Sequence, residues 1–332
     1  MTFRPLRAPR HGSLLLCALA AASVPWCSCS STSDAPGNPS SRSPSYGTSS
    51  PAAVAAPLQV GFAGSRQYPP NAPGLYASSY ILIDALTGKT LAYRNPDQIR
   101  PVASTQKLLT ALVILEDGDL DQLVTIAPED TRAPPSKMYF KAGERYTRRQ
   151  LLTAFLIKSH NDVAEALARD NAGSVPAFCA KMNRKARQLG ATQSHFVNPH
   201  GLTAPGQYST ARDMARIAYH AYRNPFIRSV VCRTGCSIIT PNGAKSYETT
   251  NKLLKRMPEC TGMKTGYTDA SGRCLVASAG YGPRQVILVQ LGSNSSRIWN
   301  DAETMLRWAL RGGAENSSSS YLAGNSSSAL HR

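Results

Sequence analysis

The sequence predicts an α+β fold, in which a largely antiparallel sheet is flanked by helices and a helical subdomain lies beside it. Segments rich in strand-forming residues lie at the two ends of the folded part, at residues 76–94 and 260–291. Between them, residues 104–222 carry apolar side chains mostly at helical spacing. Strands that are segregated from helices along the chain favour an antiparallel sheet, because a parallel sheet needs the two to alternate.

Composition divides the 332-residue chain into a folded middle and two polar ends. Residues 1–29 begin with arginines and no acid, and the short apolar run that follows completes the plan of a secretory signal peptide. Residues 30–59 are rich in Ser and Pro, which predicts a linker, and residues 312–332 are a Ser-rich tail that we expect to be disordered. The remaining residues 60–311 are long enough for one folded domain.

Eight cysteines bear on the compartment and on metal binding. Cys27 and Cys29 leave open a lipoprotein-type signal with a lipid anchor, although the residues before them fit lipoprotein processing poorly. The other cysteines allow one or two disulfides in an oxidising compartment, with the pairing left open. No Cys-x-x-Cys or paired-His spacing occurs, so we expect no metal site. These other cysteines are Cys179, Cys232, Cys236, Cys260 and Cys274.

The formal net charge of +17 indicates an attraction to anionic partners. Nucleic acid is excluded as the partner, because the signal peptide predicts export and no nucleic-acid-binding motif is present. Anionic envelope polymers remain as nonspecific partners. We therefore expect an exported protein of the periplasm or cell envelope.

Periodicity and the positions of Pro and Gly predict the order of the elements. Two β-rich segments flank the turn 85–88 and predict a hairpin at the edge of the sheet. The next helix is apolar nearly all round, so we expect it to be buried, and later helices start at Thr or Ser-Pro capping signals. The expected elements are a hairpin at 76–94, a helix at 104–117, an irregular segment at 120–146, helices at 147–157, through 163–167, at 174–190 and 210–222, a turn at 198–202, strands at 260–267, 273–279 and 285–291, and a helix at 297–310.

Ser104 and Lys107 stand where the buried helix begins and are the first candidates for chemistry. Positions i and i+3 of a helix share a face, with Cβ atoms roughly 5–6 Å apart, so the amine can reach the hydroxyl. Burial lowers the pKa of a lysine and makes its amine a base, and a base beside a serine activates it as a nucleophile. The alternative for this pair alone is an ordinary capping serine followed by a lysine that reaches solvent.

Two polar triplets follow, Ser159-His160-Asn161 between two helices and Lys264-Thr265-Gly266 on a strand. Each triplet is a weak signal alone. In the chain order Ser-x-x-Lys, Ser-x-Asn and Lys-Thr-Gly, however, the three motifs are the signature of penicillin-recognising serine enzymes.

Five stretches of the chain resemble the D-alanyl-D-alanine carboxypeptidases of the low-molecular-weight penicillin-binding proteins, serine peptidase family S11. The resemblance implies a penicillin-binding transpeptidase or β-lactamase-like fold, with a D,D-peptidase catalytic domain at 60–311. Two departures stand out: His160 replaces a usual glycine, and no β-rich second domain with a membrane helix follows residue 311. The five stretches, within residues 75–310, are 103–107, 158–162, 198–202, 209–214 and 262–268.

The resemblance implies a serine-type carboxypeptidase that trims the terminal D-alanine from peptidoglycan stem peptides and is inhibited covalently by β-lactams. Ser104 would attack the carbonyl of the penultimate D-alanine while Lys107 takes its proton. Ser159 would relay a proton to the leaving amine, and Asn161 would bind the substrate backbone and position Lys107. No metal or cofactor is implied.

The resemblance also assigns the substrate-binding residues. Lys264 and Thr265 would hold the terminal carboxylate, and Gly266 would let the substrate lie close against the strand. The backbone N–H groups of Ser104 and Tyr267 would form the oxyanion hole, in which one donor is worth roughly 2.7–4 kcal/mol of barrier.

Three rival functions remain. A D,D-endopeptidase that cuts peptidoglycan cross-links would share every motif. A class A-type β-lactamase would need a Glu-x-x-Leu-Asn loop, which is absent between the second and third motifs. A non-catalytic wall-binding protein is disfavoured by the complete set of reactive residues.

Three histidines, His160, His195 and His200, are interpreted as structural, because the Gly-x-Ser-x-Gly elbow of Ser-His hydrolases is absent. Arg297 is interpreted as a surface residue near the carboxylate site.

Overall fold

The structure is a computed structural model of the chain, and it describes residues 67–69, 71–294 and 296–314. These residues belong to one compact unit, which spans Gly61–Arg332. The predicted signal peptide with Cys27 and Cys29, the linker, and the tail from residue 315 onward lie outside the described residues.

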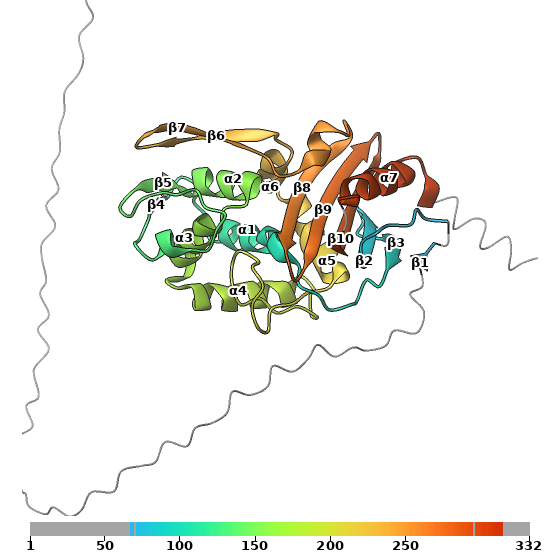
Figure 1. The fold of residues 1–332 in the computed structure, drawn as a ribbon, viewed down its shortest axis with the longest axis horizontal. Coiled ribbons are helices and arrows are strands. Elements are labelled where there is room, and N and C mark those ends of the chain that lie inside the picture. Colours follow the sequence, from blue (N-terminus) through green and yellow to red (C-terminus); the bar gives the residue numbers. More distant parts are fainter. Residues whose placement is uncertain (1–66, 70, 295, 315–332) are drawn as a thin grey trace, which may run out of the picture. The chain divides into compact units, whose positions relative to one another are not determined.

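One antiparallel sheet crosses the unit in the strand order β1-β3-β2-β10-β9-β8 (Figure 1). The N-terminal hairpin β2–β3 pairs with β10, so strands from both ends of the folded part meet in the middle of the sheet. This arrangement confirms the predicted α+β class. The strands of this sheet are β1 (Gln67–Tyr68), β2 (Ser79–Asp84), β3 (Thr90–Arg94), β8 (Cys260–Thr268), β9 (Gly272–Tyr281) and β10 (Arg284–Ser293).

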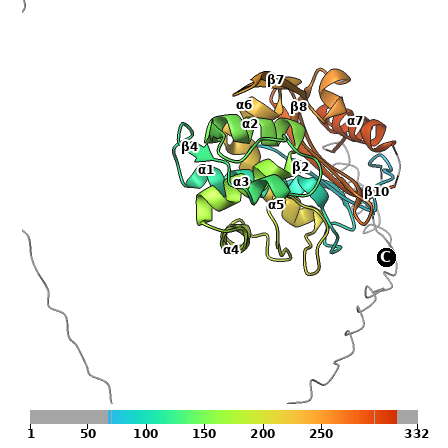
Figure 2. The ribbon, with the colours of Figure 1, turned by 60° about the vertical axis from the view of Figure 1, so that its left-hand side comes forward.

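Helices cover both faces of the sheet, because its central strands are apolar on both sides. Ile81, Ile287 and Val289 point into a cluster shared with α1–α6, and Leu82 and Leu288 point into a second cluster under α7. Figure 2 shows α7 on the opposite side of the sheet from α1, α3 and α5. The helices are α1 (Lys107–Glu116), α2 (Arg148–Lys158), α3 (Asn161–Ala172), α4 (Val175–Gln188), α5 (Ala211–Arg223), α6 (Pro225–Val231) and α7 (Ile298–Leu310), with 3-10 helices η1 (Ala103–Gln106), η2 (Asp130–Arg132) and η3 (Lys252–Lys255).

Capping residues fix the helix starts that the sequence predicted. Thr147 and Gln150 form a reciprocal capping box at α2, and the hydroxyl of Ser174 accepts the N–H of Ala177 at α4. Thr210 likewise accepts the N–H of Asp213 at α5. The buried helix α1 begins with the tighter turn of η1, which carries Ser104.

Two hairpins and one short helix were not expected from the sequence. Strands β4 (Leu123–Thr125) and β5 (Arg145–Thr147) pair inside the segment 120–146 that was predicted to be irregular. Strands β6 (Gly235–Thr240) and β7 (Gly243–Glu248) pair along the top of Figure 1, and α6 precedes them. The first pair is too short for a period to show, and the second is largely exposed, so neither carries a clear alternation of apolar residues.

The cysteines at 179, 232, 236, 260 and 274, for which one or two disulfides were considered, are all free thiols. Among the described residues, no helix is long and apolar enough to cross a membrane.

Candidate active site

The three motifs meet around one cavity of about 360 Å³. It opens between η1, the corner that joins α2 to α3, and strand β8. Six of the eight predicted site residues line it, whereas Lys107 and Lys264 lie behind its wall with 0% and 1% exposure. The six lining residues are Ser104, Ser159, Asn161, Thr265, Gly266 and Tyr267.

The Lys107 amine has three polar neighbours. Its Nζ lies 2.9 Å from the Ser104 hydroxyl, 2.8 Å from Asn161 Oδ1 and 2.5 Å from the His200 carbonyl oxygen. An amide or carbonyl oxygen can only accept a hydrogen bond, whereas a hydroxyl can also donate one. A neutral amine has two N–H groups and one lone pair, so it can donate to the two carbonyl oxygens and accept from Ser104. An ammonium could instead donate to all three oxygens, so the contacts fit either form and burial decides between the ammonium and the neutral amine.

Burial favours this neutral form. It lowers the pKa of Lys107 well below its ordinary value of 10.5, and the nearby positive charge of Lys264 lowers it further. Burial also lowers the pKa of Lys264, to about 7. The downward shift of the Lys107 pKa therefore favours an amine with the lone pair that proton abstraction needs.

The corner between α2 and α3 places the second motif. Helix α2 ends at Ser159, whose φ of 72° is left-handed, so the chain turns sharply into Asn161 at the start of α3. Asn161 is fixed by Pro135 and Ser136, since its Nδ2 donates to the Pro135 carbonyl and its N–H to that of Ser136. The Ser159 hydroxyl forms no hydrogen bond within the described part of the chain and adjoins the cavity.

His160, the residue between them, packs away from the cavity. Its ring is buried and lies edge-on to Tyr247 of β7, with ring centroids 4.8 Å apart. Burial, assisted by Lys158, Lys107 and Lys264, lowers its pKa to about 4. The ring is therefore neutral in the working range of pH and serves as a contact to the β6–β7 hairpin.

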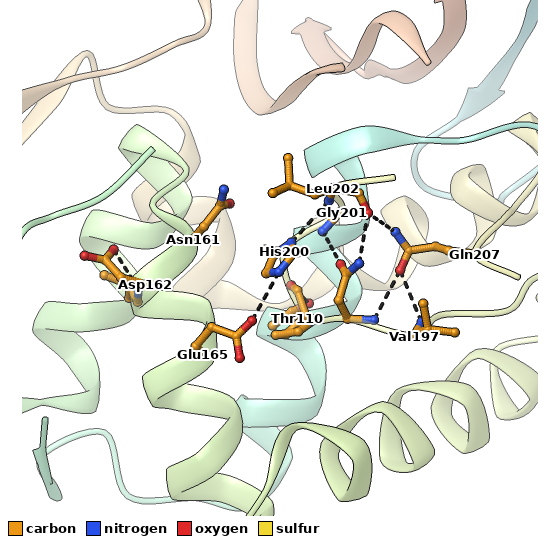
Figure 3. Close-up of polar contacts among 12 residues, drawn as sticks. Thr110, Asn161, Asp162, Glu165, Val197, His200, Gly201, Leu202 and Gln207 are labelled. Atoms are coloured by element: carbon orange, nitrogen blue, oxygen red, sulfur yellow. Dashed lines mark hydrogen bonds and ion pairs between the residues drawn. The ribbon is translucent and has the colours of Figure 1, made fainter. Parts of the chain in front are cut away.

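The turn at residues 198–202 is held by polar contacts to its neighbours (Figure 3). His200 Nδ1 accepts the N–H of Leu202, so its Nε2 is the protonated nitrogen, and Nε2 lies 3.1 Å from Glu165 Oε1. Its ring is thus turned toward α3, while its carbonyl oxygen faces Lys107. Gly201 has a φ of 92°, and a Cβ there would lie 2.2 Å from the Ala103 carbonyl oxygen.

The backbone of β8 at Gly266 packs directly against the backbone that carries Ser104, with no room for a side chain between them. A Cβ on Gly266 would lie 2.8 Å from the backbone nitrogen of Ser104 and 2.9 Å from the Ala103 Cβ. The close packing of β8 on η1 explains why a glycine is needed here, and the close approach of substrate to Gly266 stays a prediction. The backbones of Ser104 and Tyr267, which were predicted to form the oxyanion hole, adjoin the same cavity.

Lys264 and Thr265 point to opposite faces of β8. Thr265 lines the cavity, and its hydroxyl lies 2.6 Å from that of Thr250. Lys264 is buried on the other face, where its Nζ donates to the Thr265 carbonyl over 3.1 Å. Thr265 thus adjoins the cavity and Lys264 does not, and contact of either residue with a substrate carboxylate stays a prediction.

Sequence reasoning missed several residues of the cavity wall. Arg297, interpreted as a surface residue, is exposed, and it donates to the Tyr76 hydroxyl over 2.5 Å and stacks on its ring. No motif marked the additional lining residues, which come from separate loops and from the start of α7. They include Thr250, Lys252, Arg273, Ile298 and Trp299. Within the described residues, no group of three His, Cys, Asp or Glu side chains is placed to hold a metal ion.

Residues 66–295 match the family model of the D-alanyl-D-alanine carboxypeptidases, peptidase family S11. The chain belongs to this family. It is 35% identical to the D-alanyl-D-alanine carboxypeptidase DacB2 of Mycobacterium tuberculosis over 238 residues, which cover 70% of this chain and 81% of the relative. A D-alanyl-D-alanine endopeptidase of Pseudomonas aeruginosa is 33% identical over 264 residues, 76% of this chain and 84% of that protein.

A solved structure confirms the fold of this family member. The crystal structure of a D-alanyl-D-alanine carboxypeptidase from M. tuberculosis H37Rv superimposes with a TM-score of 0.70 at 34% identity. The match covers 72% of this chain and 93% of that structure. The resemblance inferred from the five sequence stretches is thereby confirmed.

Proposed function

We propose that Ser104 is the nucleophile by which this S11 member removes the terminal D-alanine from peptidoglycan stem peptides. As a member of the family, the chain is a serine-type D-Ala-D-Ala carboxypeptidase and a hydrolase. The observation that carries the residue assignment is the Lys107 amine, which is fully buried, lowered in pKa and 2.9 Å from the Ser104 hydroxyl.

Acylation begins when Lys107 accepts the Ser104 proton and Oγ bonds to the carbonyl carbon of the penultimate D-alanine. The developing oxyanion is stabilised by the N–H groups of Ser104 and Tyr267, which act without reorganisation because both belong to fixed backbone. The tetrahedral intermediate then collapses and the peptide C–N bond breaks. The leaving amine takes the proton from Lys107, with Ser159 as the relay.

Deacylation repeats these steps with water in place of the serine hydroxyl. Water loses a proton to Lys107, attacks the ester carbonyl and releases the shortened peptide. A β-lactam acylates Ser104 in the same way, but its leaving nitrogen stays tethered to the acyl group. No Asp or Glu lines the described part of the cavity, so no carboxylate base is at hand to hydrolyse the penicilloyl ester quickly.

Cleavage of cross-links is the second candidate activity, because the relative from P. aeruginosa is named an endopeptidase. Both activities break a D-alanyl peptide bond and use the same acyl-enzyme. They differ in whether the leaving group is a free D-alanine or a longer chain.

A peptidoglycan substrate implies a protein of the cell envelope, where the net charge of +17 favours anionic polymers as nonspecific partners. A lipid anchor on Cys27 or Cys29 remains a prediction from the sequence.

Release of D-alanine tests the proposal. We expect D-Ala-D-Ala peptides with a free C-terminal carboxylate to have a kcat/KM at least tenfold higher than their C-terminal amides, since a charge-assisted hydrogen bond contributes roughly 1.5–3 kcal/mol. Lys264→Gln should remove most of this preference by lowering the rate on the acid. Equal slowing of both substrates would show that Lys264 serves proton transfer instead. Failure of wild type to release D-alanine from the acid or D-alaninamide from the amide would refute the function.

A further inference from the structure

The cavity does not end at the catalytic residues but continues around the free edge of β8. Within the described sheet, β8 is the last strand, and its outer edge pairs with no other strand. Gly266 lies opposite Cys274 and faces the cluster of α1, whereas Thr265 lies opposite Leu275 and faces the cluster under α7. Because residues from both faces line one cavity, the cavity reaches from Ser104 past the strand edge to the start of α7.

We call the part on the α7 side the outer lobe, and define it by Thr250, Lys252, Arg273, Ile298 and Trp299. Arg273 belongs to the same face as Tyr267 and Thr265, since Tyr267 and Arg273 are directly opposed on β8 and β9. Its guanidinium lies over the Tyr267 ring at 5.4 Å.

The walls of the outer lobe are held by fixed contacts outside it. Arg256, at the end of η3, donates to Asn300 over 2.6 Å and pairs with Glu303 over 3.2 Å, both on the first turns of α7. The side chain of Asn251 caps η3 by accepting the N–H of Leu253. Trp299 packs against the cluster under α7 while still lining the cavity. Hydrogen bonds and packing therefore fix the residues that form the wall of the lobe.

The lobe combines two unpaired cations with an apolar wall. Lys252 and Arg273 are exposed, and neither forms an ion pair within the described part of the chain. No acidic side chain lines the described cavity, and its charged lining residues Lys158, Lys252 and Arg273 are all basic. Of the two apolar residues at the start of α7, Trp299 is half-buried and supplies apolar surface to the lobe, whereas Ile298 is only 2% exposed.

We propose that the outer lobe is a leaving-group subsite for D-amino acids with side chains larger than that of alanine. The carboxylate of such a residue lies by Thr265, Lys252 and Arg273, and its side chain lies on the Trp299 indole. A methyl group offers too little surface to cover an indole, whereas a longer apolar chain does. The reaction is unchanged, because the same C–N bond breaks and the leaving amine takes the same proton.

This inference rests on the proposed function, and a series of peptides D-Ala-D-X tests it. We expect wild type to cleave peptides with X as D-leucine or D-phenylalanine with a kcat/KM within tenfold of that for D-alanine. Trp299→Ala should lower kcat/KM for the two larger residues at least tenfold and for D-alanine less than threefold. Trp308→Ala is the matched control, because Trp308 is on the same helix and packs on the same cluster away from the cavity.

The cations are tested separately. The double variant Lys252→Gln/Arg273→Gln should raise KM at least tenfold for D-Ala-D-Leu as the free acid and change it less than threefold for the amide. Lys89→Gln, an exposed lysine on the β2–β3 turn, is the control and should change neither.

Several results would overturn the subsite. One is a wild-type kcat/KM for the larger D-residues that is more than a hundredfold below that for D-alanine. Another is a Trp299→Ala variant whose kcat/KM falls equally on all substrates while its rate of acylation by penicillin is unchanged. In either case, continued release of D-alanine from D-Ala-D-Ala would leave the proposed function intact. Loss of both D-alanine release and acylation in wild type would instead remove the function on which the subsite depends.

Discussion

Replacing Lys107 with arginine should abolish most acylation although the positive charge is kept. The Lys107 amine can receive the Ser104 proton only through a lone pair, and burial provides that lone pair by lowering the pKa. Arginine stays protonated at any usable pH and offers donors only. Since a positioned general base contributes typically 10²–10⁴-fold, we expect the acylation rate to fall by about that factor.

Lys107→Met separates chemistry from folding. Methionine keeps roughly the length of the buried side chain, but Asn161 Oδ1 and the His200 carbonyl oxygen lose their hydrogen-bond donor. Each unsatisfied group should lower the free energy of unfolding by roughly 1–3 kcal/mol. We expect a folded protein with a lower Tm and no fast acylation. Thermal unfolding gives the first quantity, and stopped-flow fluorescence with a labelled penicillin gives the second.

The pH dependence of acylation completes this test. A lysine with the ordinary pKa of 10.5 would be neutralised on the order of a hundredfold more at pH 10 than at pH 8. Because the pKa of Lys107 lies well below that value, the wild-type rate should level off at a lower pH than an ordinary lysine would allow. A Lys107→Arg variant within tenfold of wild type, or a wild-type rate that climbs steadily to pH 10, would refute the neutral-base mechanism.

Three further predictions follow from contacts around the site. Gly266→Ala should lower acylation at least a hundredfold, because the new Cβ would meet the Ser104 backbone at 2.8 Å; the rate with a labelled penicillin measures this. Burial depresses the Lys264 pKa to about 7, so the unfolded state binds more protons between pH 7 and pH 10. The free energy of unfolding should therefore rise with pH in that window by up to about 1.4 kcal/mol per unit relative to Lys264→Met, as measured by urea denaturation. His160→Gly should lower stability by about 2 kcal/mol, seen as a lower Tm, because it removes the buried ring that packs on Tyr247.

Each of these predictions has a contrary result. Near-normal acylation by Gly266→Ala would show that β8 can move away from the nucleophile. Parallel pH curves for wild type and Lys264→Met would show that Lys264 has an ordinary pKa. An unchanged Tm for His160→Gly would show that the β6–β7 hairpin does not depend on the His160 ring.

The fold could be predicted from the sequence because local signals and distant motifs agreed. Capping residues such as Thr147 and Thr210 mark helix starts. The apolar residues of β2 and β10 identify both segments as strands, although the two strands come from opposite ends of the domain. The β6–β7 hairpin escaped prediction because most of it is exposed, so no apolar face distinguishes it from a polar loop.

The site was predicted in its chemistry but not in its shape. The Ser-x-x-Lys spacing placed Ser104 beside Lys107 because one helical turn suffices to join them. The opposite orientations of Lys264 and Thr265 depend on which face of β8 each occupies, which the motif alone does not state. Lys252 and Trp299 line the cavity because η3 and α7 pack beside it. Their positions in the sequence follow no motif that could have predicted this.

Covalent labelling of Ser104 tests the central claim most directly. Intact-mass spectrometry of wild type incubated with a β-lactam should show one adduct of the full mass of the inhibitor, persisting for minutes or longer, with peptide mapping to Ser104. Ser104→Ala, which keeps the fold and the cavity but has no hydroxyl, should show none. The account would be contradicted by a wild type that forms no adduct, or by an adduct of equal yield on Ser104→Ala.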